Sequence, residues 1–201
     1  MDVTDEIELG GRLLAITHPP DATELIDEDA FEREEFLPYW AELWPSSIAL
    51  ARAVTALPVA GLAVVELGCG LAVPSIAAAL GGARALATDW SSEALAYAER
   101  NARDNGAELE IARVAWASAD ALVARAPFDL VLAADVLYEA RNAAQLRELL
   151  PRLGGEVRLA DPGRPALQGF LAGAEDDWLV ERAPTEELRH GGLYRLTRRV
   201  G

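Results

Sequence analysis

Lysine is absent from this chain of 201 residues, and cysteine and histidine are nearly so, with Cys69, His18 and His190 as their only examples. A single cysteine excludes a framework of disulfide bonds. The two histidines lie far apart and offer neither a zinc-ligand spacing nor a partner for a cysteine nucleophile, so we expect no metal ion. The lack of lysine also excludes the Gly-Lys-Ser/Thr loop that binds phosphate in many nucleotide-binding proteins.

Long apolar runs are missing as well. No stretch is long and apolar enough to span a bilayer, and the first ten residues are acidic where a signal peptide would be basic. These features predict a cytoplasmic protein with no membrane partner.

Acidic side chains outnumber basic ones by 33 to 18, which gives a formal net charge of −15. This charge argues against a nucleic-acid partner, because the phosphate backbone binds to basic surfaces. Thirteen of the acidic residues lie within residues 1–43, where the only basic residues are Arg12 and Arg33. They form either a solvated surface or a rim that attracts a basic protein substrate.

The length fits one domain, and a hydrophobic content of 51% predicts a globular chain with a substantial core. Apolar residues on both sides of Gly10 and Gly11 predict a hairpin, and a helix is expected in the acidic residues 22–36. We expect an acidic N-terminal extension, residues 1–45, that packs on a core of residues 46–201. We also expect a monomer.

The most informative stretch is residues 62–80, LAVVELGCGLAVPSIAAAL. A short apolar run leads through Glu66, Gly68 and Gly70 into an alanine-rich segment, which predicts a strand, a tight turn and a helix. Glycines in such a turn let the backbone approach a nucleotide or nucleoside closely. A dinucleotide fingerprint would need a third glycine where Val73 stands, and Glu66 would repel a phosphate. A cationic or uncharged polar ligand suits the turn better, and S-adenosylmethionine, with an ammonium, a sulfonium and a ribose, is such a ligand.

The rest of the chain alternates strands with helices. Beyond the glycine turn, we expect strands at 84–89, 109–115, 128–135, 156–160, 178–183 and 193–199, and helices at 46–57, 91–104, 142–153 and 165–174. This order predicts a Rossmann-like, seven-stranded, mostly parallel sheet with helices on both faces and an antiparallel C-terminal strand.

Ligands of such sheets bind at the carboxyl ends of the strands. Four acids and one aromatic residue occur there, namely Glu66, Asp89, Trp116, Asp135 and Asp161. Asp89 is suited to accept hydrogen bonds from both ribose hydroxyls, although an acid at a helix start is also common. Trp116 is suited to stack on adenine.

Asp135 and Tyr138 are the candidate reactive pair. Residues three apart on a helical turn face the same side. A carboxylate and a phenol together can orient a lysine-like amine for attack on an activated methyl group. The alternative is that Tyr138 packs in the core while Asp135 caps the following turn.

The segment before the helix at 46–57 is rich in aromatic residues, with Tyr39, Trp40 and Trp44 close together. These side chains form either part of the core or a lid over a ligand. Ser46 or Ser47 is expected to cap the helix that follows.

Glu66-Leu67-Gly68-Cys69-Gly70, Asp89 and Asp135-Val136-Leu137-Tyr138 occur in an order and spacing that resembles the seven-β-strand (class I) S-adenosylmethionine-dependent methyltransferases. The resemblance covers about residues 38–200, and the Asp-x-x-Tyr element is similar to that of protein lysine methyltransferases. Trp44-Pro45 and Asp161-Pro162-Gly163-Arg164-Pro165 resemble more narrowly the electron-transfer flavoprotein β-subunit lysine methyltransferases and their bacterial relatives. The sequence departs from many of these enzymes at Ala72, where they have a third glycine.

The resemblance implies a methyltransferase domain over residues 46–201, with S-adenosylmethionine as cofactor. It also implies a protein substrate methylated on lysine, with the electron-transfer flavoprotein β-subunit as a candidate. Asp135 and Tyr138 would face the acceptor amine as catalytic residues. The expected cofactor-binding residues are Trp44, Glu66, Gly68, Gly70, Asp89, Trp90, Trp116 and Asp135.

Two other functions stay open from the sequence. One is a small-molecule N-methyltransferase on the same fold, and the other is a nucleoside-binding module without catalysis. A nucleic-acid methyltransferase is disfavoured by the acidity and by the lack of an Asn-Pro-Pro-Tyr element after the fourth strand.

Overall fold

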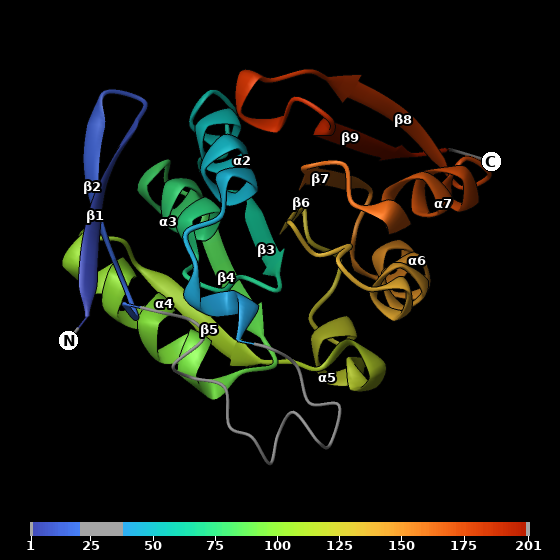
Figure 1. Cartoon of the computed structure of the whole chain (residues 1–201). Helices are drawn as coiled ribbons and strands as arrows, with labels where there is room; N and C mark the ends of the chain where they lie inside the picture. The colour runs from blue at the N-terminus through green and yellow to red at the C-terminus, as the bar shows by residue number, and fades with distance from the viewer. Residues whose placement is uncertain (1, 21–37, 200–201) are drawn as a thin grey trace, which may run out of the picture.

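A seven-stranded sheet forms the centre of the molecule, in the order β5-β4-β3-β6-β7-β9-β8. Figure 1 shows it in the computed structural model of the chain, which describes residues 2–20 and 38–199. Strands β3 to β7 are parallel to one another, whereas β9 is antiparallel to both β7 and β8. The predicted mostly parallel sheet with an antiparallel C-terminal strand is therefore confirmed. The strands are β3 (Ala63–Leu67), β4 (Arg84–Asp89), β5 (Leu109–Arg113), β6 (Leu130–Ala134), β7 (Glu156–Asp161), β8 (Trp178–Ala183) and β9 (Gly192–Arg198).

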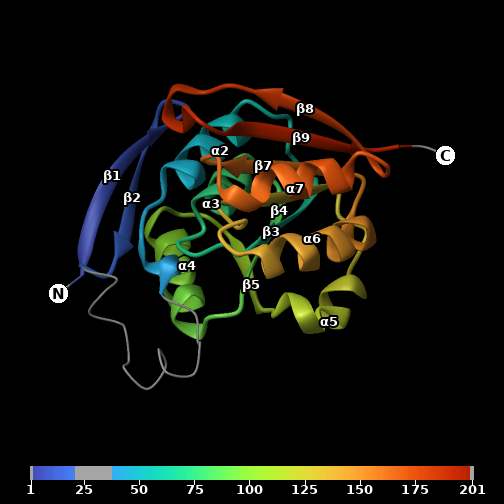
Figure 2. The same cartoon turned by 45° about the vertical axis from the view of Figure 1, so that its right-hand side comes forward.

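Helices cover both faces of this sheet, as Figures 1 and 2 show. In β6, Leu130 and Leu132 belong to the apolar cluster of α2 and α3, whereas Val131 and Ala133 belong to that of α6 and α7. Because both faces of β6 are covered, its sequence LVLAA is continuously apolar. One face carries α2 (Pro45–Thr55), α3 (Val73–Leu80) and α4 (Ser92–Asp104), and the other carries α5 (Asp120–Val123), α6 (Ala140–Leu153) and α7 (Pro165–Ala174). No helix in the described part of the chain is long and apolar enough to cross a membrane.

Most element boundaries agree with the sequence prediction to within two residues. The short helix α5 was not predicted, because four residues carry too little periodicity. Among the described residues, three single-turn 3-10 helices were also not predicted, namely η2 (Tyr39–Ala41), η3 (Trp116–Ser118) and η4 (Glu186–Leu188).

The expected serine cap of α2 is wrong. The helix begins at Pro45, with Trp44 as the residue before it, and no side chain caps this end. Proline is favoured at the first helical position because its φ is already helical. This start places Ser46 inside the helix, where its hydroxyl donates to Asp135 Oδ2 at 3.2 Å.

The N-terminal hairpin is confirmed. It pairs β1 (Val3–Leu9) with β2 (Arg12–His18) through Gly10 and Gly11, which both have positive φ. The buried apolar residues of the hairpin join the cluster formed with α2 and α3. The expected helix at 22–36 lies outside the described residues, and the domain boundary at residue 45 stays a prediction.

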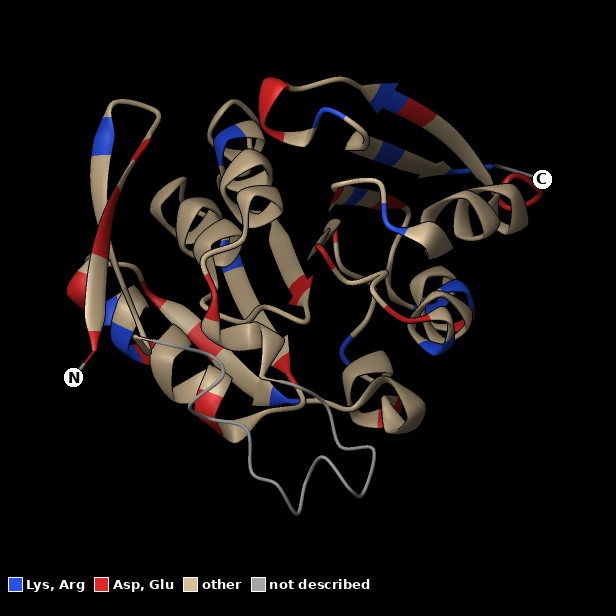
Figure 3. Cartoon of the chain, viewed as in Figure 1, with Lys and Arg blue, Asp and Glu red and all other residues tan. Residues whose placement is uncertain are grey.

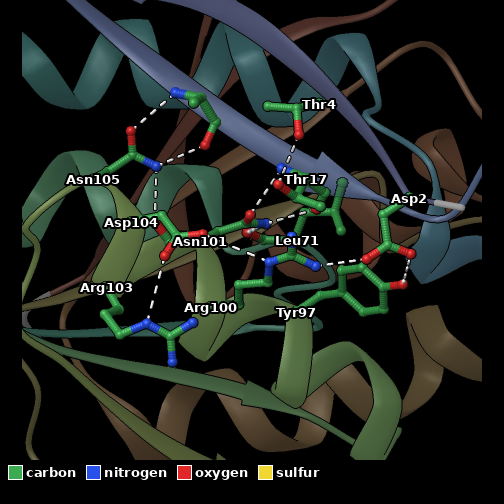
Figure 4. Close-up of polar contacts among 11 residues, drawn as sticks. Asp2, Thr4, Thr17, Leu71, Tyr97, Arg100, Asn101, Arg103, Asp104 and Asn105 are labelled. Carbon is green, nitrogen blue, oxygen red and sulfur yellow. Dashed lines mark hydrogen bonds and ion pairs between the residues drawn. The ribbon is translucent and has the colours of Figure 1, made fainter.

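Asn101 of α4 and Asn105, the C-cap of this helix, attach the hairpin to the sheet domain (Figure 4). Asn101 Oδ1 accepts from the Thr17 N–H at 2.8 Å, and Asn101 Nδ2 donates to the Thr17 carbonyl at 3.1 Å. Asn105 makes the same pair of bonds to Ala15, at 2.9 and 2.8 Å. Residues four apart on a helix and two apart on a strand are both spaced by about 6 Å, so the two amides follow the strand edge.

Replacing Asn101 by alanine should lower the free energy of unfolding by about 2–4 kcal/mol. Asn101 is fully buried and Thr17 is 4% exposed, so the substitution leaves two buried backbone groups without partners. Urea unfolding followed by circular dichroism measures the change. Arg103→Ala on the same helix, with a side chain 70% exposed, is the matched control. Equal stability losses in the two variants would contradict the anchoring by Asn101.

Candidate active site

A cavity of about 260 Å³ opens at the carboxyl ends of β3, β4 and β6. A site of this size lies near the lower end of the usual range for small-molecule pockets. All nine residues that the sequence singled out for the cofactor and the reaction line this one cavity. They are Trp44, Glu66, Gly68, Gly70, Asp89, Trp90, Trp116, Asp135 and Tyr138.

The wall of the cavity is acidic and aromatic. Four acidic side chains line it, from Glu42, Glu66, Asp89 and Asp135, and none of the described residues that line it is basic. Figure 3 shows that the basic residues lie mainly on the outer helices and on the β8–β9 pair. A cationic or polar ligand is therefore favoured, and a phosphate is disfavoured.

The aromatic segment before α2 covers one side of the cavity. Tyr39, Trp40 and Trp44 all line it, so the interpretation as a lid describes their position better than core packing does. Trp44 Nε1 donates to the Tyr39 carbonyl at 2.6 Å, which fixes the turn. Asn142 and Gln145 of α6 also line the cavity but were not predicted, because their only signal in the sequence is a position one helical turn apart.

The glycine turn after β3 needs its glycines. Gly68 and Gly70 have φ of +65° and +49°, a region that side chains rarely adopt. A Cβ on Gly68 would lie 3.2 Å from the Val136 side chain, and one on Gly70 would lie 3.2 Å from the Trp40 carbonyl oxygen. Ala72 also has positive φ, +62°, and so takes the backbone conformation expected of the missing third glycine.

Glu66 is bound to the start of α3. Its Oε2 accepts from the Ser75 N–H at 2.9 Å and from Ser75 Oγ at 2.5 Å. Only 1% of Glu66 is exposed, and this burial raises its pKa to about 8, with a smaller contribution from the charge of Asp89. The carboxyl group therefore orders the turn, in addition to facing the cavity.

The raised pKa of Glu66 predicts a pH dependence of stability. Between the ordinary value of 4.5 and about 8, the folded chain holds a proton that the unfolded chain has lost. The free energy of unfolding should thus fall with rising pH in this window, by up to about 1.4 kcal/mol per pH unit from this group. Glu66→Gln keeps an acceptor for Ser75 and removes the ionisation.

Urea unfolding of the wild type and Glu66→Gln at several pH values between about 5 and 9 measures this dependence. The variant should gain stability relative to the wild type as the pH rises. Parallel pH profiles for the two proteins would contradict the raised pKa.

Asp89 ends β4 and links it to the glycine turn. Its Oδ2 accepts from the Gly70 N–H, and its Oδ1 accepts from the Ser91 N–H, both at 3.0 Å. Burial raises the pKa of Asp89, whereas these backbone bonds oppose the rise. Each carboxylate oxygen can accept a second hydrogen bond, so Asp89 can still bind a pair of hydroxyls.

Asp135 does not lie on a helical turn with Tyr138, as the sequence analysis expected. The residues between β6 and α6 are irregular, and Asp135 has a φ of +57°. A non-glycine residue in this conformation is strained, a feature that clusters at functional sites. Both side chains nevertheless line the cavity.

The carboxylate of Asp135 is held from two sides. Its Oδ1 accepts from Arg164 Nε at 2.7 Å, and its Oδ2 accepts from the hydroxyl of Ser46. Only 5% of the Asp135 side chain is exposed. The sequence analysis gave Arg164 no function of its own, because the loop between β7 and α7 carries no local signal of this contact.

Tyr138 remains a phenol at neutral pH. Burial raises its pKa to about 12, and its ring lies 4.9 Å from that of Tyr39. The hydroxyl can therefore orient a ligand by hydrogen bonding but does not act as a base.

Asp161 is the one strand-end acid that does not line the cavity. Its Oδ1 accepts from the N–H groups of Gly163 and Arg164, both at 2.7 Å, and so shapes the loop before α7. His18 lies at the end of β2 and contacts Asp5. Within the described residues, no group of three His, Cys, Asp or Glu side chains could hold a metal ion.

The fold is that of the class I methyltransferases. The chain aligns with magnesium protoporphyrin IX methyltransferase from Synechocystis PCC 6803, in a structure with bound SAM, at a TM-score of 0.63. The alignment covers 89% of this chain and 98% of that chain, at 18% identity.

A family model of lysine methyltransferases matches residues 39–157, and the chain therefore belongs to the lysine methyltransferase family. It is 35% identical over 136 residues to the electron transfer flavoprotein beta subunit lysine methyltransferase of Xenopus laevis, covering 63% of this chain and 53% of the relative. It is 31% identical over 170 residues to the ribosomal protein L11 methyltransferase of Stenotrophomonas maltophilia, covering 82% of this chain and 52% of the relative. The chain spans about half the length of these two relatives.

Proposed function

We propose that this protein transfers methyl groups from S-adenosylmethionine to lysine side chains of a protein substrate. The observation that carries the proposal is the acidic, aromatic cavity at the strand ends of a lysine methyltransferase family member. A sulfonium, an ammonium and an acceptor amine are all compatible with such a cavity, because carboxylates and aromatic faces attract cations.

The cofactor supplies a methyl group that is already activated on a sulfonium. In the proposal, Asp89 accepts hydrogen bonds from the ribose hydroxyls, while Gly68 and Gly70 let the backbone approach the methionine portion closely. The aromatic residues Trp44, Trp90 and Trp116 enclose the cofactor, and Glu66 holds the turn on which it lies.

On the acceptor side, Asp135 and Tyr138 position the amine. Most of the acceleration then comes from alignment of the amine with the methyl carbon and from exclusion of water by the aromatic lid. Asp135 accepts an N–H of the amine, and Tyr138, as a neutral phenol, accepts or donates one further hydrogen bond.

The first candidate substrate is the electron-transfer flavoprotein β-subunit, as the names of several relatives suggest. Ribosomal protein L11 is the second, because the match to its methyltransferase covers more of this chain. The net charge of −15 suits a basic segment around the target lysine in either case. A cytoplasmic location and a monomeric state stay predictions from the sequence.

Methyl-labelled S-adenosylmethionine tests the proposal. The purified protein is incubated with each candidate substrate and, separately, with a cell lysate; labelled proteins are then separated and the modified residues identified by mass spectrometry. Label on lysine of one protein, absent with Asp135→Asn, supports the proposal. Label only in the low-molecular-weight fraction would instead favour a small-molecule N-methyltransferase. Cofactor binding without any transfer would indicate a binding module.

A further inference from the structure

Arg164 is the part of the site that the proposed mechanism does not use. Its Nε donates to Asp135 Oδ1 at 2.7 Å, and its guanidinium carbon lies 5.5 Å from the centroid of the Trp44 ring. The carboxylate that would receive the acceptor amine is thus already paired with a cation.

The backbone fixes Arg164 in this position. Its N–H and that of Gly163 donate to Asp161, which is fully buried. Gly163 has a φ of +100°, and a Cβ there would lie 2.8 Å from the His190 carbonyl oxygen. Pro165 then begins α7. A side chain anchored in this way meets Asp135 at little entropic cost.

The pairing leaves room for a further ligand on Asp135. Within the described residues, Oδ1 accepts from Arg164 and Oδ2 accepts from Ser46, at 3.2 Å. Because a carboxylate oxygen accepts two hydrogen bonds, each oxygen can accept one more N–H. Asp135 lines the cavity, whereas Arg164 is not among the residues that line it.

We propose that Arg164 is a positioning residue that cancels the charge of Asp135, so that the acceptor amine binds as the neutral free base. This inference rests on the proposed function. An unpaired carboxylate would favour an ammonium, which has no lone pair for attack. Paired with Arg164, Asp135 keeps its hydrogen-bonding geometry but attracts a proton on the amine less strongly.

The chemical step balances with the amine in this form. The amine nitrogen forms a bond to the methyl carbon while the carbon–sulfur bond breaks, and that bond's electron pair goes to sulfur. The methylated nitrogen leaves the step as a cation and keeps its proton in neutral solution, because its pKa stays near the value of about 10 that a lysine amine has. The proton that a solution lysine carries at neutral pH is thus released on binding, before the transfer.

Other charged or titratable groups surround the pair and stay unchanged when Arg164 is replaced. A comparison of the wild type with an Arg164 variant therefore isolates the effect of the guanidinium charge on the bound amine. On the elements packed around the site, these groups are Tyr39, Glu42, Glu66, Asp89, Tyr138, Glu139, Arg141 and Asp161.

Proton release on ligand binding tests the inference without the natural substrate. The probe is an S-adenosylmethionine analogue in which a short aminoalkyl chain replaces the methyl group, and S-adenosylmethionine itself is the reference. Calorimetry at about pH 8, in buffers of different ionisation enthalpy, gives the number of protons released when each ligand binds. Four methylene groups in the chain keep the amine far enough from the sulfonium for its pKa to stay near that of a lysine side chain, about 10, so the free probe is protonated at that pH.

The wild type should release about one proton more with the probe than with S-adenosylmethionine. Arg164→Gln should release almost none and bind the probe at least tenfold more tightly at this pH, because Asp135 is then unpaired. Arg164→Lys restores the charge and should restore most of the release. Arg152→Gln, whose native ion pair with Asp120 lies on the outer face of α6, should behave as the wild type.

Each outcome of this calorimetry either supports or overturns the role of Arg164. Equal proton release in the wild type and Arg164→Gln, or a wild type that binds the probe without releasing a proton, would overturn the inference and leave the proposed function standing. A wild type that binds S-adenosylmethionine but not the probe would overturn it too. Failure to bind S-adenosylmethionine at all would instead remove the proposed function, and the inference with it.

Discussion

Asp135→Asn is expected to lower kcat/KM for methyl transfer by about 100- to 10,000-fold, the range typical of groups that orient a reacting proton donor or nucleophile. The substitution keeps the size of the side chain but replaces one acceptor oxygen with a donor NH₂. It also leaves Arg164, a partly buried cation, without its anionic partner. The acceptor amine then loses one of the two carboxylate oxygens that accept its N–H groups, and a donor NH₂ stands in its place.

Affinity for S-adenosylhomocysteine should fall by less than about tenfold in the same variant, because one carboxylate contact is a small part of the cofactor site. Radiometric assays measure the transfer, and calorimetry measures the affinity. Asp129→Asn is the matched control. Asp129 directly precedes the first residue of β6, at the end of the strand away from the cavity, and accepts a hydrogen bond from the Ala63 N–H. Full activity of Asp135→Asn would show that the acceptor binds elsewhere.

The fold could be predicted because its signals are local. Apolar strands, an N-capping serine at Ser91 and the glycine turn around Gly68 and Gly70 each lie within a few residues of one another in the sequence. The strand-end rule predicts that Glu66, Asp89, Trp116, Asp135 and Asp161 lie at one edge of the sheet. The structure places the first four of these residues in the same cavity, whereas Asp161 shapes the loop before α7.

The details that the sequence did not reveal depend on contacts between distant segments. Ser46 looked like a helix cap, but it bonds to Asp135, which lies 89 residues further along the chain, directly after β6. Arg164 was visible only as part of a loop motif, although it forms an ion pair with Asp135. The side-chain amides of Asn101 and Asn105 bind the hairpin. No periodic pattern in the sequence predicts such a contact.

Asp89→Ala should weaken binding of S-adenosylhomocysteine by about 100-fold or more. Hydrogen bonds to a charged group contribute about 1.5–3 kcal/mol each, and two ribose hydroxyls would be lost as donors to this carboxylate. The substitution also frees the N–H groups of Gly70 and Ser91, so part of the loss arises from a less ordered glycine turn.

Asp89→Asn separates these two causes. An asparagine retains one acceptor oxygen in the same place, so it keeps one of the two backbone bonds and can accept from one hydroxyl. Its affinity should therefore lie between those of the wild type and Asp89→Ala, as measured by calorimetry with S-adenosylhomocysteine. Glu93→Gln in the first turn of α4 is the control, because it changes a nearby carboxylate outside the cavity lining. A dissociation constant for Asp89→Ala within about threefold of the wild type, in a folded protein, would mean that the ribose is bound by another residue.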